Sequence, residues 1–232
     1  MAKISNCFQY QTHIFARNMD ITLKQRFDSI IFDLDGTLWD STEGVAAAWQ
    51  SAKEEYGYVK NDITAASIGG IAGMAYDAIY DHLFPELSDE QRQEFKAKCA
   101  KKELEVLSSK GGVLYPGLVD ALKALSTRYK LFIVSNCQSG YIEAFLDFYK
   151  LHDYFVGHQC YGTKSCPKAD NIKDIVVDHQ LKSPVYVGDT QGDYESSKKA
   201  GVPFIFVSYG FGEVKEGQIA TAKSLTELAE IL

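Results

Sequence analysis

Short apolar runs alternate with helical patterns along most of the chain. Runs rich in β-branched and aromatic residues predict five buried strands, at 29–32, 131–134, 155–156, 185–187 and 204–207. Helical patterns lie between and after them, at about 116–128, 139–150, 168–179 and 193–200, with a closing helix capped by Ser224 and Glu227. Because strands alternate with helices, the pattern predicts an α/β fold, a Rossmann-like parallel sheet with helices on both faces.

Residues 40–112 differ from the rest because they contain no strand-like run. They predict helices at about 41–56, with Ser41 or Thr42 as N-cap, at 76–83, and at 88–108. The third helix starts at a capping box formed by Ser88 and Gln91. Its apolar side consists of Phe95, Cys99, Leu104 and Leu107. Three glycines within 67–73 predict a turn or flexible loop.

This change of pattern predicts the domain organisation. We expect an α/β core formed by 27–39 and 113–232, with an all-helical domain inserted at 40–112 and hinges near 39–40 and 111–112. Residues 1–26 form an N-terminal extension of polar and aromatic character without the apolar core of a secretory signal. Met19 is an alternative translation start, because all the residues needed for the first strand lie after it.

Composition and charge narrow the function classes. The chain of 232 residues carries a net charge of -7, which argues against a nucleic-acid partner. No apolar run approaches the length of a membrane-spanning helix, so we expect no membrane partner. Five scattered cysteines without a C-x-x-C pair favour a reducing, cytoplasmic location. The pattern predicts no particular oligomeric state.

Three of the predicted strands end in polar residues. Asp33 and Asp35 follow the first strand, Ser135 and Asn136 the second, and Asp189 with Asp193 the fourth. The carboxyl ends of parallel strands meet at one edge of a sheet, which is where open α/β sheets bind ligands. Three independent polar groups at one edge predict a functional site there.

The first strand end is the most informative of the three. In an extended chain residues two apart point the same way, so Asp33 and Asp35 can converge while Leu34 turns to the core. Gly36 permits a close turn past a ligand, and Thr37 adds a hydroxyl and a backbone N–H. The stretch predicts a site for a hard cation and a phosphate.

Mg²⁺ is the cation that this set of acids fits. It is usually held by one or two carboxylates, waters and substrate phosphate, and Asp33 and Asp189 can supply the carboxylates. Asp193 can ligate the ion, orient a metal-bound water, or cap the helix that follows. Asp33 can also attack phosphorus as a nucleophile once a cation neutralises the phosphate.

Further groups can contact a phosphoryl oxygen. Ser135 offers a hydroxyl and Asn136 an amide, although both are common in turns. Lys168 begins a predicted helix, where the helix dipole disfavours a cation, and this misfit indicates a nearby anion. Lys164 is the competing lysine.

These residues resemble the four motifs of the haloacid dehalogenase (HAD) superfamily in order. The matching elements are Asp33-x-Asp35-Gly36-Thr37-Leu38, then Ser135-Asn136, then Lys168, then Gly188-Asp189-x-x-x-Asp193. The resemblance covers about residues 27–210. The helical stretch after the first strand is similar to the cap of the phosphoglycolate phosphatase and β-phosphoglucomutase branch.

The resemblance implies a role for each motif residue. Asp33 would form an aspartyl-phosphate, and Asp35 would protonate the leaving group and then activate water. Ser135 and Lys168 would hold the phosphoryl oxygens. Asp33, the backbone carbonyl of Asp35, and Asp189 would bind Mg²⁺, with Asp193 close by. The sequence 169–172 resembles the family's helix after its motif lysine, which favours Lys168 over Lys164.

The presence of Asp35 selects the reaction class. The dehalogenases of the superfamily lack this second aspartate, and an alcohol leaving group needs a general acid. We therefore expect a Mg²⁺-dependent phosphatase, phosphoglycolate phosphatase-like, that hydrolyses small phosphorylated metabolites. A β-phosphoglucomutase-like hexose-phosphate mutase uses the same aspartates and stays open. A non-catalytic phosphate-sensing or partner-binding protein is the alternative of another class.

The resemblance places substrate selection in the cap. The loop facing the site is expected at 67–73, with Ser67, Gly69 and Gly70 as specificity residues. Arg92 is the only arginine of the predicted cap and lies within its long helix, so no arginine clamp for a carboxylate is evident. This weakens phosphoglycolate as the specific substrate.

Overall fold

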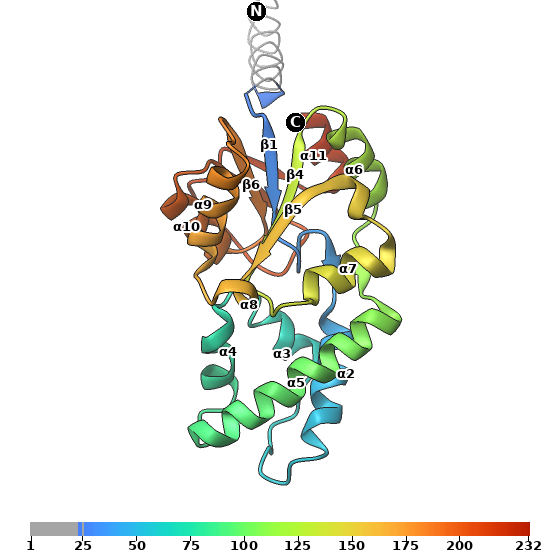
Figure 1. Cartoon of the computed structure of the whole chain (residues 1–232), viewed down its shortest axis with the longest axis vertical. Helices are drawn as coiled ribbons and strands as arrows, with labels where there is room; N and C mark the ends of the chain where they lie inside the picture. The colour runs from blue at the N-terminus through green and yellow to red at the C-terminus, as the bar shows by residue number, and fades with distance from the viewer. Residues whose placement is uncertain (1–22, 25) are drawn as a thin grey trace, which may run out of the picture.

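The computed structural model of the chain describes residues 23–24 and 26–232 (Figure 1). The predicted extension 1–26 falls almost wholly outside these residues, as do Cys7 and Met19. None of the helices in the described part is both long and apolar enough to cross a membrane.

A six-stranded parallel sheet forms the centre of the fold, and five of its strands were predicted. Its order is β5-β4-β1-β6-β7-β8. The strands are β1 (Ser29–Phe32), β4 (Lys130–Ser135), β5 (Phe155–Cys160), β6 (Pro184–Gly188), β7 (Phe204–Val207) and β8 (Ala220–Ala222). The chain leaves β1 for β4 on one side and later returns to β6 on the other. The carboxyl end of β1 is therefore the topological switch point, where such sheets bind ligands.

The two faces of the sheet bury separate hydrophobic clusters. Ile30 and Phe32 of β1 belong to one cluster, and Ile31 between them belongs to the other, because successive strand residues point to opposite faces. The first face is covered by α6 (Leu118–Ser126), α7 (Tyr141–Tyr149) and α11 (Leu225–Ile231). The second is covered by α9 (Lys168–Asp178) and α10 (Gln191–Ala200) (Figure 1). Helices on both faces confirm the predicted Rossmann-like arrangement.

The differences from the sequence prediction lie at the edges of the sheet. β5 continues past the predicted 155–156 because an edge strand does not need a continuous apolar run, and His158 and Gln159 stay half-buried. The short edge strand β8 and the short helices η1 (His152–Tyr154) and α8 (Tyr161–Lys164) were not predicted. α10 begins at Gln191, because Thr190 is its N-cap and Asp193 closes the capping box.

A helical insert lies below the carboxyl edge of the sheet (Figure 1). We give this name to residues 42–110, which form α2 (Thr42–Lys53), α3 (Ala65–Gly69), α4 (Tyr76–Leu83) and α5 (Asp89–Lys110). The predicted capping box of Ser88 and Gln91 at the start of α5 is confirmed, with both reciprocal hydrogen bonds present. The insert packs around Phe95, whose ring meets Phe84 at 5.1 Å between centroids.

A two-stranded antiparallel ribbon joins the insert to the sheet. β2 (Trp39–Asp40) pairs with β3 (Val113–Leu114) at the two positions where the chain leaves and re-enters the α/β part. Gly111 has φ +67°, and a Cβ there would lie 2.6 Å from the Phe148 ring, so this position favours glycine. The boundaries at 39–40 and 112–113 stay predictions.

Candidate active site

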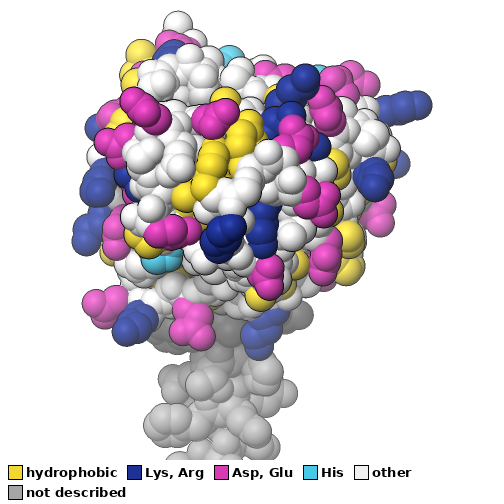
Figure 2. Space-filling model, turned by 90° about the horizontal axis from the view of Figure 1, so that it is seen from below, with side chains coloured by type: hydrophobic (Ala, Val, Ile, Leu, Met, Phe, Trp, Pro, Cys, Tyr) yellow, Lys and Arg dark blue, Asp and Glu magenta, His cyan; other side chains and the backbone are white. Residues whose placement is uncertain are grey.

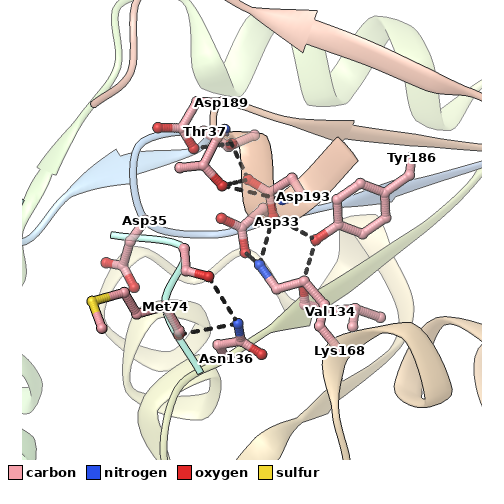
Figure 3. A network of polar contacts seen from close by, with 12 residues as sticks. Asp33, Asp35, Thr37, Met74, Val134, Asn136, Lys168, Tyr186, Asp189 and Asp193 are labelled. Carbon is pink, nitrogen blue, oxygen red and sulfur yellow. Dashed lines mark hydrogen bonds and ion pairs between the residues drawn. The ribbon is translucent and has the colours of Figure 1, made fainter. Parts of the chain in front are cut away.

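Asp33 directly follows β1 and is buried at the switch point (Figure 3). Its Oδ1 accepts a hydrogen bond of 2.8 Å from Lys168 Nζ, and the same ammonium donates to Asp193 Oδ1 at 2.6 Å. Burial lowers the pKa of Lys168, but the charges of Asp193 and Asp33 raise it further, so its net pKa lies well above the usual value. Lys168 is therefore a fixed cation at the start of α9.

Asp189 follows β6 and is held by two donors. Thr37 Oγ1 donates to its Oδ1 at 3.1 Å, and the backbone N–H of Phe211 donates to its Oδ2 at 2.7 Å. Gly36 has φ +82°, and a Cβ there would approach Asp189 Oδ2 to 2.2 Å. The glycine of the first motif therefore lets the chain turn against this carboxylate.

Three carboxylates crowd together at this point. Oxygens of Asp33, Asp189 and Asp193 lie within 4.8 Å of one another, and all three residues are buried. Burial and then the charge of Asp193 raise the pKa of Asp33 well above its usual value, and the same two causes raise the pKa of Asp189 to about 7. Lys168 supplies one positive charge for three acids. The donor set of hard oxygens and the surplus of negative charge fit a divalent cation such as Mg²⁺.

Asp35 lies outside this cluster and has a separate set of partners. Its Oδ1 accepts from Trp39 Nε1 at 2.9 Å, Ser41 Oγ at 2.6 Å and Tyr141 Oη at 2.9 Å. These three donors fix the orientation of the carboxyl group. Burial raises the pKa of Asp35, and the hydrogen bonds from Ser41, Tyr141 and Trp39 oppose part of this effect. A carboxyl group held in this way is suited to proton transfer.

A cavity of about 100 Å³ lies between the sheet edge and the helical insert. Asp33, Asp35, Ser135 and Lys168 line its end at the sheet. Apolar side chains of the insert line the other end: Val45, Trp49, Ile68, Ile71, Met74 and Ile79. The volume accommodates several groups of the size of a water molecule, so a small metabolite fits.

Comparison with known proteins assigns the family. The model of the haloacid dehalogenase-like hydrolases matches residues 30–207, which is more than half of the chain. The chain belongs to the haloacid dehalogenase-like hydrolases. The predicted resemblance is thus confirmed.

Relatives within this hydrolase family include phosphatases. The phosphoglycolate phosphatase of Aquifex aeolicus (strain VF5) is 30% identical over 192 residues, which cover 78% of this chain and 85% of that protein. The phosphoglycolate phosphatase of Vibrio vulnificus (strain YJ016) is 28% identical over 201 residues, with 81% and 86% covered. The chain is a hydrolase similar to these enzymes.

Solved structures of other proteins share the fold. A haloacid dehalogenase-like family hydrolase from Streptococcus pneumoniae superposes with a TM-score of 0.73 at 26% identity, covering 88% of this chain and 97% of that one. CbbY from Rhodobacter sphaeroides, solved in complex with phosphate, gives 0.72 at 16% identity, with 87% and 96% covered. At that identity the second likeness shows the fold alone.

The structure brings the predicted HAD residues together at one edge of the sheet. The cavity is lined by Asp33, Asp35, Ser135, Asn136 and Lys168, while Thr37, Asp189 and Asp193 lie at the same edge without lining it. Lys164 forms a half-exposed ion pair with Asp174 and does not line the cavity, whereas Lys168 contacts Asp33. Thr37 does not line the cavity either, because its hydroxyl donates to Asp189. Lys168 is therefore the lysine that contacts the site acids, and Thr37 holds the carboxylate of Asp189 through a hydrogen bond.

The three predicted specificity residues do not line the cavity. The expected loop at 67–73 is wrong in its first part, because Thr64 and Ser67 form a capping box that starts α3. Ser67 therefore uses its side chain within the helix, and Gly69 and Gly70 lie at the helix end. Their neighbours Ile68, Ile71 and Met74 line the cavity instead.

Glu103 is the site residue that sequence reasoning missed. It lies on α5, is fully buried, and lines the cavity. The predicted apolar side of this helix used Leu104, but Leu104 is only half-buried. A spacing of four residues from Phe95 through Cys99 leads to position 103 and then to Leu107, so the stripe itself points to an acid on the inner face.

Asn136 connects the sheet to the insert. Its Nδ2 donates to the carbonyl oxygens of Gly73 at 3.3 Å and Met74 at 3.1 Å (Figure 3). The sequence predicted that this amide binds phosphate. In the structure the amide nitrogen instead donates its hydrogen bonds to the insert. Asn136 therefore holds the segment that forms one wall of the cavity.

Substitution Asn136→Ala is expected to loosen this wall. Loss of two hydrogen bonds, each worth about 1 kcal/mol, should speed amide hydrogen exchange in 71–74 by roughly tenfold or more. Exchange in the sheet should stay unchanged. Asn61→Ala is the matched control, because Asn61 Nδ2 also donates to a carbonyl oxygen, that of Leu83, away from the cavity. Equal exchange in both variants at 71–74 would contradict this role.

Proposed function

We propose that this hydrolase is a Mg²⁺-dependent phosphatase that cleaves small-molecule phosphate monoesters through an aspartyl-phosphate on Asp33. The observation that supports this most is the pair Asp33 and Asp35 lining one cavity, with Lys168 Nζ 2.8 Å from Asp33. The family relatives named as phosphoglycolate phosphatases support the same reaction class.

In the first step a carboxylate oxygen of Asp33 attacks phosphorus, and the bond from phosphorus to the ester oxygen breaks. Lys168 stabilises the negative charge on the phosphoryl oxygens, and Ser135 lies at the same end of the cavity to donate its hydroxyl. Asp35 gives its proton to the departing alcohol oxygen. The raised pKa of Asp35 favours the protonated form that this step requires.

In the second step the aspartyl-phosphate is hydrolysed. Asp35, now ionised, takes a proton from a water molecule, and the oxygen of that water attacks phosphorus. The bond to Asp33 breaks, which regenerates its carboxylate and releases inorganic phosphate. The fixed orientation of Asp35 through Trp39, Ser41 and Tyr141 supports its action in both steps.

Asp33 and Asp189 are the side chains that would hold Mg²⁺, with the backbone carbonyl of Asp35 implied by the family. A bound ion would neutralise charge on the phosphate and let an anionic nucleophile approach it. Asp193 uses Oδ2 to accept from Thr190 and Oδ1 to accept from Lys168. We therefore assign Asp193 to positioning Lys168 and to a place beside the ion.

Removal of divalent metal is expected to abolish turnover. Hydrolysis of p-nitrophenyl phosphate should fall at least about 100-fold in EDTA, since the three crowded acids then repel the incoming phosphate. Excess Mg²⁺ should restore the rate. Circular dichroism in EDTA is the control, because Lys168 already compensates part of the charge and the fold should persist. Full activity of the metal-free protein would contradict the proposed function.

A further inference from the structure

The buried carboxyl group of Glu103 has no cation beside it. Its Oε2 accepts from Trp49 Nε1 at 2.7 Å and its Oε1 from Gln138 Nε2 at 2.9 Å. Both donors are neutral, and none of the ion pairs in the described part of the chain includes Glu103. Glu103 is thus a buried acid without charge compensation from the protein.

Glu103 has acceptor capacity to spare and lines the cavity. Each carboxylate oxygen can accept two hydrogen bonds and has one here. Burial raises the pKa of Glu103 to about 7, while the bonds from Gln138 and Trp49 favour the ionised form. A donor placed in the cavity would add a further hydrogen bond to this acid.

None of the basic side chains of the insert is among the residues that line the cavity. Figure 2 shows the insert end of the molecule, where basic and acidic side chains are interspersed on the outer surface. Four of these basic side chains pair with acids: Arg92–Asp81, Lys96–Asp77, Lys98–Glu55 and Lys102–Glu55. Lys168 is the one cation among the residues described as lining the cavity, and it contacts Asp33 and Asp193.

This arrangement disfavours a substrate with a carboxylate at its far end. Such a group would be desolvated between apolar side chains and would face Glu103 without a partner of opposite charge. A hydroxyl or ammonium group would instead donate to Glu103.

We propose that the cavity selects small phosphate monoesters whose far end donates hydrogen bonds and carries no negative charge, and that Glu103 accepts from that end. This inference rests on the proposed phosphatase function and names the substrate class for the same site. It makes Glu103 a binding residue with no part in the chemical steps.

Three two-carbon esters of nearly equal size test this selection in the wild-type protein. They are 2-aminoethyl phosphate, 2-hydroxyethyl phosphate and 2-phosphoglycolate, and they differ only in the far group. The expected result is a kcat/KM at least about tenfold higher for the amino and hydroxy esters than for the carboxylate ester. A carboxylate ester that equals or exceeds either of the others would overturn the inference.

Glu103→Gln should reduce that preference at least about tenfold, because an amide no longer favours a donor over a carboxylate. The readout is the ratio of kcat/KM values within one variant, which a merely structural effect does not change. Glu94→Gln is the matched control, because Glu94 also accepts from an aromatic residue, Tyr58, but is exposed. An unchanged ratio in Glu103→Gln would overturn the inference.

Failure of the proposed function and failure of the Glu103 assignment give different experimental results. If the wild type does not hydrolyse p-nitrophenyl phosphate with Mg²⁺, the proposed function fails. If it does so and prefers 2-phosphoglycolate, only the assignment of Glu103 fails. A wild-type ratio that favours 2-phosphoglycolate overturns the inference even where Glu103→Gln does not fold.

Discussion

Asp33→Asn is expected to lower kcat for p-nitrophenyl phosphate at least about 1000-fold, because an amide is not a nucleophile toward phosphorus. The variant should still fold. Its side chain has the same shape, its carbonyl oxygen can accept from Lys168, and its neutral charge removes repulsion with Asp193 and Asp189. Steady-state kinetics and thermal unfolding measure the two effects separately.

The control for this variant is Asp170→Asn. Asp170 lies on the same helix as Lys168, half-exposed and paired with Lys173, so the change removes a carboxylate outside the cavity. Its kcat should match the wild type. An Asp33→Asn enzyme with a rate within tenfold of wild type would exclude Asp33 as the nucleophile.

Asp35→Asn is expected to have the second largest effect, and its size should depend on the leaving group. Loss of the general acid should slow hydrolysis of an alkyl phosphate by about 100- to 10,000-fold. The effect on p-nitrophenyl phosphate should be smaller in the first step, because nitrophenolate leaves without a proton. The amide oxygen can keep the bonds from Trp39, Ser41 and Tyr141, so the site geometry should persist.

The measurement compares the two esters under single-turnover conditions, which isolate the first step. Wild type and Asp35→Asn are each mixed in excess with the alkyl and the aryl ester. Equal losses for both esters would contradict proton donation by Asp35 to the leaving group. A loss confined to the alkyl ester would locate its role at that step.

Much of the α/β part could be predicted from the sequence because its signals are local. Each central strand is an apolar run whose residues alternate between two clusters, as Ile30, Ile31 and Phe32 do. Since parallel strands end at one edge, the placement of Asp33 and Asp189 there followed from the chain order alone. Lys168 could be chosen over Lys164 only with the family resemblance, because both lie near the start of the helix.

The rest depends on how the insert packs against the sheet. Glu103 bonds Gln138 of the α/β part, and Asn136 bonds the carbonyl oxygens at 73–74 of the insert. The four-residue spacing on α5 places Glu103 on the inner face, but no local spacing encodes these partners, which meet only after the insert has folded back. Ser41 occupies the N-cap position of α2, as expected, but its side chain does not cap the helix. Its hydroxyl donates to Asp35 instead, and the Thr42 N–H is accepted by the side chain of Asp40. Edge strand β8 was missed because three small residues give no hydrophobic signal.

Trapping of the covalent intermediate tests the central claim most directly. The enzyme is mixed with Mg²⁺ and a radiolabelled phosphate ester, quenched in acid within one turnover, digested, and mapped by mass spectrometry. The account predicts a phosphoryl group on the peptide that contains Asp33, at the Asp33 side chain, and none in Asp33→Asn. Turnover without any covalent phosphate, or a phosphoryl group on another residue, would contradict it.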